Sequence, residues 1–172
     1  MAARTATNAE FDDILDSKGV ARSAAAPGGG GAAETPMSAA ELANVARHKR
    51  AYALFSAHDP AMFDLFADDV IEVQEPEPIV GKPALIELNR AFWGGFSDIR
   101  VDVDRAWGAG AHTFLAGRLR GTNDGLFAPM GLDHTGKAID VGFVEVVRWR
   151  DGKAVRSVPL MDEAELARQL GQ

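Results

Sequence analysis

The sequence contains no cysteine. This absence excludes disulfide bonds, thiolate catalysis and zinc sites built from cysteine. The four histidines do not indicate a metal site either, because no two of them have a metal-ligand spacing such as His-x-x-x-His. Long apolar stretches are also missing, since no run approaches the roughly 20 residues that cross a bilayer. We therefore expect neither a bound metal nor a membrane-spanning segment.

Positive charge is scarce too. The formal net charge is −7, whereas sequence-independent binding of nucleic acid requires a basic surface that replaces counterions. Nucleic acid is therefore not an expected partner. The chain has 172 residues, of which 47% are hydrophobic and 25% are charged. This composition is typical of a globular protein, and the length suits one domain with an extension.

Composition divides the chain into a flexible extension, residues 1–36, and a folded domain, residues 37–172. Within the extension, "GVARSAAAPGGGGAAETP" is nearly all alanine, glycine and proline, and such a segment cannot bury a core. The extension is also acidic near its start and lacks the continuous apolar core of a signal peptide. On these grounds we expect a cytoplasmic protein.

A short apolar pattern lies inside the extension, at residues 9–18. Phe11, Ile14 and Leu15 fall at i, i+3 and i+4 among acidic residues, which is the pattern of a helical turn that docks into a groove. An unstructured tail with a few apolar side chains explains the same residues equally well. Residues 9–18 are therefore a candidate contact with a protein partner.

The domain is predicted to begin with helices and to continue with antiparallel strands. A capping box at Ser38–Glu41 starts the first helix, whose apolar stripe is formed by Leu42, Val45, Tyr52 and Phe55. Further helices are expected in "PAMFDLFA", "GKPALIELNRAFWGGF" and "EAELARQL", and strands in "DVIEVQEP", "IRVDVDRAW", "HTFLAGRLRGT", "AIDVGFVEVVRWR" and "KAVRSVPLM". This order indicates an α+β fold with helices on one face of a curved sheet.

Three polar residues fall on faces that should be buried. Tyr52 lies on the first helix, Asn89 lies in the stripe of the second long helix, and Glu145 shares the inner face of its strand with Phe143. Burial without partners is costly, and a few convergent polar groups in apolar surroundings are typical of a ligand pocket. We expect Tyr52, Asn89, Phe143 and Trp93 to line such a pocket.

The buried carboxylate of Glu145 has two explanations. It is either paired with a cation such as Arg118 or Arg120, or it has a raised pKa in a cavity. The first explanation makes Arg118 a pocket residue, while the alternative is that both arginines face solvent. Asn89 and Tyr52 also have structural explanations, as a bond to a loop backbone and as a core residue with its hydroxyl at the rim.

The stretch "GTNDGLFAPMGLDHTGKAIDV" resembles the SnoaL-like polyketide (ester) cyclases of the NTF2-like superfamily, in which Gly-Thr-His-x-Gly-x-Phe leads to Thr-Gly-Lys. The matching residues are Gly121, Thr122, Gly125, Phe127, Thr135, Gly136 and Lys137. The segments "FWGGFSDIRVDV", "VRWRDGK" and "MDEAELARQLG" also resemble that family. The resemblance extends over essentially the whole domain.

The resemblance implies a cone of helices packed on a strongly curved antiparallel sheet that encloses a pocket, commonly in a homodimer or a higher homo-oligomer. It implies intramolecular aldol or isomerase chemistry, without cofactor or metal, on an apolar polyketide-like molecule of secondary metabolism. The family's general acid/base corresponds to Asp162. Tyr52, Asn89 or a neutral Glu145 would then donate a hydrogen bond to the enolate oxygen.

Three positions qualify this expectation. Asn123 stands where the family has a histidine, and Glu145 also replaces a frequent histidine. Asp162 has a second explanation, because together with Glu165 it has the spacing of a helix capping box.

Two functions are therefore predicted. One is a cyclase- or isomerase-type enzyme with Asp162 as base and Glu145 assisting. The alternative is a non-catalytic NTF2-like module that binds a ligand, or docks a partner through its N-terminal tail.

Overall fold

Helices cover one face of a six-stranded sheet in the part of the chain that the computed structural model describes, residues 36–74 and 76–172. The segment 9–18 and almost all of the predicted extension lie outside the described residues. The helices are α2 (Ala39–Ser56), α3 (Lys82–Gly95) and α4 (Glu163–Leu170), with short 3-10 turns η1 (Pro60–Leu65) and η2 (Ala128–Met130). The strands are β1 (Phe66–Glu72), β2 (Ile79–Val80), β3 (Arg100–Ala109), β4 (His112–Thr122), β5 (Ala138–Arg150) and β6 (Lys153–Met161).

The first helix begins as the sequence predicts. The Ser38 hydroxyl accepts a bond from the Glu41 backbone N–H at 3.3 Å, and the Glu41 carboxylate accepts one from the Ser38 N–H at 2.7 Å. The prediction that Leu42 belongs to the apolar stripe of this helix is wrong, because the Leu42 side chain is 51% exposed. The buried face of α2 runs instead through His48 and Ala51, and the turn of about 100° per residue carries Leu42 away from that face.

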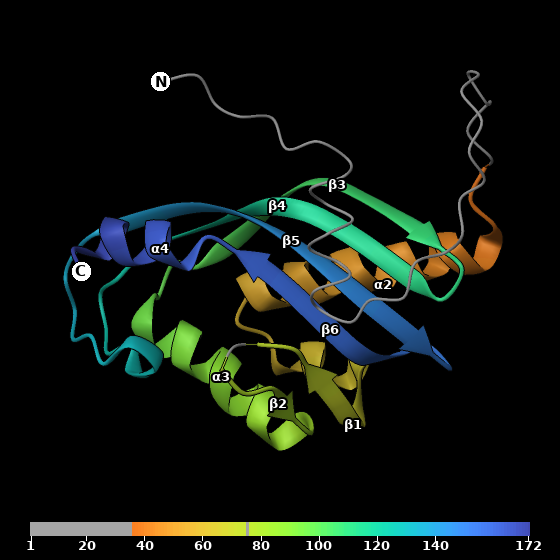
Figure 1. Cartoon of the computed structure of the whole chain (residues 1–172), viewed down its shortest axis with the longest axis horizontal. Helices are drawn as coiled ribbons and strands as arrows, with labels where there is room; N and C mark the ends of the chain where they lie inside the picture. The colour runs from red at the N-terminus through yellow and green to blue at the C-terminus, as the bar shows by residue number, and fades with distance from the viewer. Residues whose placement is uncertain (1–35, 75) are drawn as a thin grey trace. The chain divides into compact units, whose positions relative to one another are not determined.

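The sheet has the strand order β2-β1-β6-β5-β4-β3, and Figure 1 shows its curvature. Neighbouring strands are antiparallel except that β1 pairs in parallel with β6. Register shifts in β3, at Val103/Arg105, and between β5 and β6, at Arg148/Trp149, mark bulges of the kind that bend a sheet. A hairpin turn joins β5 to β6, and its residues Asp151 and Gly152 both have positive φ.

The two faces of the sheet differ in what covers them. α2 packs against β3 and β4, α3 packs against β1, and α4 packs against β5 (Figure 1). Along β4 and β5, alternate side chains such as Leu115, Val141 and Trp149 point to the face that α2 covers and are buried there. We call this the inner face.

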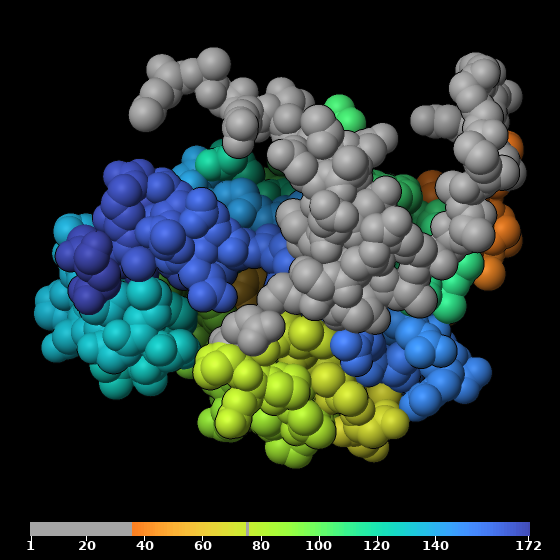
Figure 2. Space-filling view, in the orientation of Figure 1, coloured from red at the N-terminus to blue at the C-terminus, as the bar shows by residue number. Residues whose placement is uncertain are grey.

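The space-filling view shows α4 beside the loop that carries η2 (Figure 2). Within the described residues, no helix is both long and apolar enough to cross a membrane.

Candidate active site

A carboxylate lies buried on the inner face of the sheet. Glu145 of β5 accepts bonds from His48 Nε2 at 2.7 Å, from the Tyr52 hydroxyl at 2.6 Å, and from the Ser157 hydroxyl. His48 and Tyr52 come from α2, and Ser157 comes from β6, so two elements supply donors to a carboxylate on a third. We call these four residues the Glu145 centre.

A second layer of hydrogen bonds fixes the ring of His48. The indole N–H of Trp149 can only donate, and it donates to Thr113 Oγ1 at 2.8 Å. Thr113 Oγ1 also lies 2.9 Å from His48 Nδ1, at hydrogen-bond distance. Because the ionised Glu145 carboxylate can only accept, His48 Nε2 carries the hydrogen that points at it. This chain orients the imidazole as a donor to the carboxylate.

The charge of Glu145 is stabilised where it is buried. Burial by itself raises the pKa of the Glu145 carboxyl, but the hydrogen bond and charge of His48, with the bonds from Ser157 and Tyr52, hold the pKa below its usual 4.5. The prediction that Glu145 pairs with Arg118 or Arg120, or that its pKa is raised, is therefore wrong. The partner is a histidine from a different element.

Tyr52 is the only tyrosine of the chain. Burial, and then the neighbouring charge of Glu145, raises the pKa of its hydroxyl well above 10. The hydroxyl therefore stays protonated, and it can act as a hydrogen-bond donor but not as a base at neutral pH.

A second buried carboxylate lies across Ser157. Glu72 of β1 is the register partner of Ser157 of β6, and only 9% of its surface is exposed. Gln74 donates to Glu72 Oε1 at 2.6 Å. Burial, and then the negative charge of Glu145, raises the pKa of Glu72 to about 7, against the opposing hydrogen bonds from Gln74 and Ser157. The inner face thus carries one carboxylate that is ionised at neutral pH and one that is half protonated.

Sequence reasoning missed Glu72 and His48, although both left a local signal. Glu72 stands two residues from the buried Val70 in a strand, so strand alternation places both on one face. His48 stands three residues after Val45 and four before Tyr52, which places all three on one face of a helix.

The raised pKa of Glu72 predicts a pH-dependent stability. Between pH 4.5 and about 7 the native carboxyl holds a proton that the unfolded chain has released, so unfolding becomes easier as the pH rises through this window. The loss amounts to roughly 3 kcal/mol. We expect Glu72→Gln to match the wild type at about pH 4 and to exceed it by this order at about pH 8 in urea unfolding. An equal pH slope in both proteins would contradict the raised pKa.

The structure brings two further predicted residues to the Glu145 centre or near it. The Phe143 ring lies 5.3 Å from the Tyr52 ring, centre to centre. Trp93 is reached through Phe55, whose ring lies 6.5 Å from Tyr52 and 6.1 Å from Trp93. Aromatic side chains therefore connect the polar centre to α3.

Arg118 and Asn89 are not part of the Glu145 centre. Arg118 lies on the outer face of β4 and bonds Asp140 through its side chain. Arg120 on the same face bonds Asp102 at 2.5 Å. The Asn89 amide donates to the Leu85 carbonyl of its own helix at 2.8 Å. Substrate contact by Arg118 or Asn89 remains a prediction.

Asp162 caps α4. Its exposed carboxylate accepts a bond from the Glu165 N–H at 2.9 Å, which is the capping arrangement that the sequence also predicts. No hydrogen bond described for it reaches the Glu145 centre. Its catalytic role remains a prediction from family resemblance.

Asn123, which stands where the resembled family has a histidine, is fully buried. Its amide donates to the carbonyls of Gly95 at 3.0 Å and Gly125 at 2.9 Å, and its side-chain oxygen accepts from Thr135 N–H at 2.8 Å. The residue ties the end of α3 to the loop after β4, so its position is structural.

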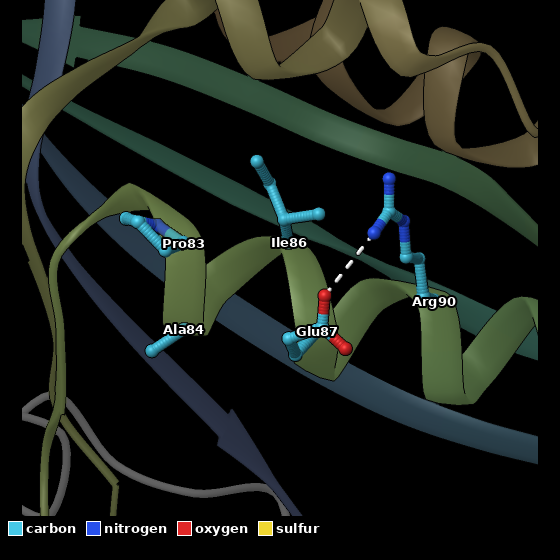
Figure 3. A pocket seen from close by; sticks show the side chains of 5 residues that line it. All are labelled: Pro83, Ala84, Ile86, Glu87 and Arg90. Carbon is cyan, nitrogen blue, oxygen red and sulfur yellow. Dashed lines mark hydrogen bonds and ion pairs between the residues drawn. The ribbon is translucent and has the colours of Figure 1, made fainter.

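A surface hollow of about 420 Å³ lies on α3, away from these residues. Figure 3 shows that its lining side chains all come from one helix. Glu87 and Arg90 form an ion pair with a nitrogen-to-oxygen distance of 3.1 Å. The lining residues are Pro83, Ala84, Ile86, Glu87 and Arg90. The two charges neutralise each other, so this hollow offers little acid-base chemistry. Within the described residues, no cluster of three or more histidine, aspartate and glutamate side chains is placed to hold a metal ion.

Comparison with known proteins identifies relatives of the fold. Residues 46–170 match the family model for SnoaL-like polyketide cyclase. No curated protein matches the chain.

Solved structures resemble the chain closely in shape. A protein assigned as a SnoaL-like polyketide cyclase from Jannaschia sp. CCS1 superposes with a TM-score of 0.71 at 20% identity, over 80% of this chain and 99% of its own. IdmH from Streptomyces antibioticus, assigned as a polyketide cyclase, gives 0.63 at 21% identity, over 75% and 99%. An NTF2-like protein of unknown function from Burkholderia pseudomallei K96243 gives 0.64 at 21%, over 76% and 98%. At these identities the likeness establishes the NTF2-like fold.

Proposed function

Because this chain belongs to the SnoaL-like polyketide cyclase family, we propose that it is a cyclase- or isomerase-type enzyme that moves a proton within an apolar, polyketide-like small molecule. The observation that carries the proposal is the Glu145 centre, a set of hydrogen-bonded polar groups on a largely apolar inner face. Enclosure by apolar side chains strengthens the interaction of such groups with a developing charge.

Tyr52 is the donor proposed for the enolate oxygen. In the structure its hydroxyl donates to Glu145 Oε2, and that oxygen also accepts from His48. If Tyr52 turns to a bound substrate, Glu145 keeps its bonds from His48 and Ser157. The reorientation therefore leaves no buried carboxylate oxygen without a donor, which lowers its cost.

Tyr52→Phe tests the proposal. We expect the variant to lower kcat by roughly 100-fold, because it removes one donor to an oxyanion. The measurement is the exchange of acidic C–H protons for deuterium in a panel of apolar, ring-containing β-keto esters, followed by mass spectrometry. Exchange requires only deprotonation, so the exact cyclisation substrate is not needed. Binding of these esters without any exchange by the wild type would instead favour the non-catalytic binding module.

Asp162→Asn tests whether the proton transfer takes place at Asp162 or at the Glu145 centre. Asparagine caps helices as well as aspartate does, so the variant keeps α4 while it removes the carboxylate. With the chemistry at the Glu145 centre, Asp162→Asn retains the exchange rate. A loss of exchange in a folded Asp162→Asn protein would return the acid/base role to Asp162, as the family resemblance predicts.

A further inference from the structure

One row of polar side chains crosses the inner face from strand to strand. β6 lies between β1 and β5, and Ser157 of β6 is paired in register with Glu72 of β1. The Ser157 hydroxyl donates to Glu145 Oε1 on β5. The Val73 N–H also donates to the Ser157 carbonyl at 2.8 Å, so the backbones are fixed at this point. Two carboxylates are thereby held on either side of one hydroxyl.

We propose that Glu72 is the catalytic base of this protein, and that Ser157 and the ionised Glu145 position it and keep its proton exchangeable. This inference rests on the proposed function and names the residue that performs its proton transfer.

The two carboxylates have different surroundings, which separates their roles. Three donors hold Glu145 in its charged form. Glu72 has fewer donors, the Gln74 amide and Ser157, and it faces the charge of Glu145. Its pKa of about 7 allows it to take up and to release a proton at neutral pH.

The charged groups around Glu72 come from several elements. The charge of Glu145 on β5 acts on Glu72 directly, and His48 acts through Glu145. Glu72 in turn contributes to the raised pKa of the Tyr52 hydroxyl on α2. The charged residues of α3, which also packs against β1, are engaged elsewhere. They form the ion pairs Lys82–Asp68 and Arg90–Glu87.

The proposed step balances without an added reactant. A Glu72 oxygen takes a proton from the carbon beside a carbonyl, and the C–H electron pair forms an enolate. In a cyclase the enolate carbon then attacks a second carbonyl carbon of the same molecule. A C–C bond forms, the C=O π bond breaks, and Glu72 returns the proton to the new alkoxide. In an isomerase the proton returns to a different carbon.

Nitrobenzisoxazole is a suitable probe for Glu72, because its opening needs only a base that removes one carbon-bound proton. The electron pair then forms a nitrile, the N–O bond breaks, and a coloured phenolate leaves. We expect wild-type protein to open the probe at a rate that rises with pH and has its midpoint near 7. Glu72→Gln should lower the rate by roughly 100-fold or more. Glu87→Gln, which changes an exposed glutamate on α3, is the matched control and should leave the rate unchanged.

Carbon-13 NMR of protein with labelled glutamate gives a second readout that requires no ligand. One carboxyl resonance should titrate near 7 and should be missing in Glu72→Gln. The proposal is overturned if that resonance titrates near 4.5, if the wild type does not open the probe faster than buffer, or if Glu72→Gln opens it at the wild-type rate.

The failure of this inference is distinguishable from failure of the proposed function. If Glu72→Gln retains deuterium exchange in the β-keto esters, Glu72 is not the base while the enzyme proposal stands. If Glu72-dependent opening of nitrobenzisoxazole occurs but no β-keto ester exchanges, Glu72 is a reactive base and the cyclase-type function is wrong.

Discussion

Glu145→Ala should lower the free energy of unfolding by about 3–5 kcal/mol, which is the range for breaking a buried, hydrogen-bonded charge arrangement. The substitution leaves three buried donors without their acceptor, namely the His48 N–H and the hydroxyls of Tyr52 and Ser157. Each such group loses its partner while it remains shielded from water. Urea unfolding monitored by tryptophan fluorescence measures the loss.

Glu145→Gln is the conservative comparison, because it keeps the side-chain volume and one acceptor oxygen while it removes the charge. We expect a smaller loss of stability and a lower pKa of Tyr52, since the charge and bond of Glu145 contribute to raising that pKa after burial itself. As Tyr52 is the only tyrosine, ultraviolet absorbance reports its titration alone. Wild-type stability in Glu145→Ala would show that the centre contributes little to the fold.

The acid side of the stability curve gives an independent check on Glu145. The folded pKa of Glu145 lies below its unfolded value of 4.5. The contribution of Glu145 to the free energy of unfolding is therefore complete above about pH 5 and is lost as the pH falls through the folded pKa. Glu72 has the opposite effect, because it lowers the stability as the pH rises from 4.5 to about 7.

Asn123→Ala should cost about 2 kcal/mol of unfolding free energy. The carboxamide is fully buried and satisfies three backbone groups, the carbonyls of Gly95 and Gly125 and the N–H of Thr135. Truncation to alanine leaves the Gly125 carbonyl and the Thr135 N–H without this partner, at about 1 kcal/mol or more for each. The Gly95 carbonyl keeps its backbone bonds from the N–H groups of Asp124 and Gly125. The midpoint of urea or thermal unfolding measures the effect.

Asn89→Ala is the matched control, because Asn89 is half-buried and bonds only the Leu85 carbonyl of its own helix among the bonds described for it. Alanine favours a helix more than asparagine does, so we expect a change within about 1 kcal/mol. If both variants lose the same stability, the loop after β4 does not depend on the Asn123 amide. In that case Asn123→His should also be tolerated as well as Asn123→Ala.

Much of the fold was predictable because its signals are local. The strands β4, β5 and β6 occupy the ranges in which "HTFLAGRLRGT", "AIDVGFVEVVRWR" and "KAVRSVPLM" alternate. Alternation with a period of two depends only on neighbouring residues. The same rule put Glu145 on a buried face, and the capping box put the start of α2 at Ser38.

The composition of the candidate site was not local in this sense. His48, Glu72 and Ser157 are widely separated in sequence and meet only because α2 covers the inner face and β1 pairs in parallel with β6. A pattern within one segment cannot report which strand becomes its neighbour. That is why the partner of Glu145 was sought among the arginines of β4, whose side chains alternate to the outer face.

By itself the sequence determined the order of the three α-helices and the five longer strands, the bounds of β4, β5 and β6, the burial of Glu145 and two possible roles for Asp162. The tertiary structure decided that the Asp162 carboxylate caps α4 and that Glu72 and Glu145 share Ser157. The physical reason lies in the range of the forces. Side-chain periodicity and capping act over a few residues, whereas the pKa of a buried carboxylate depends on which charges folding brings beside it.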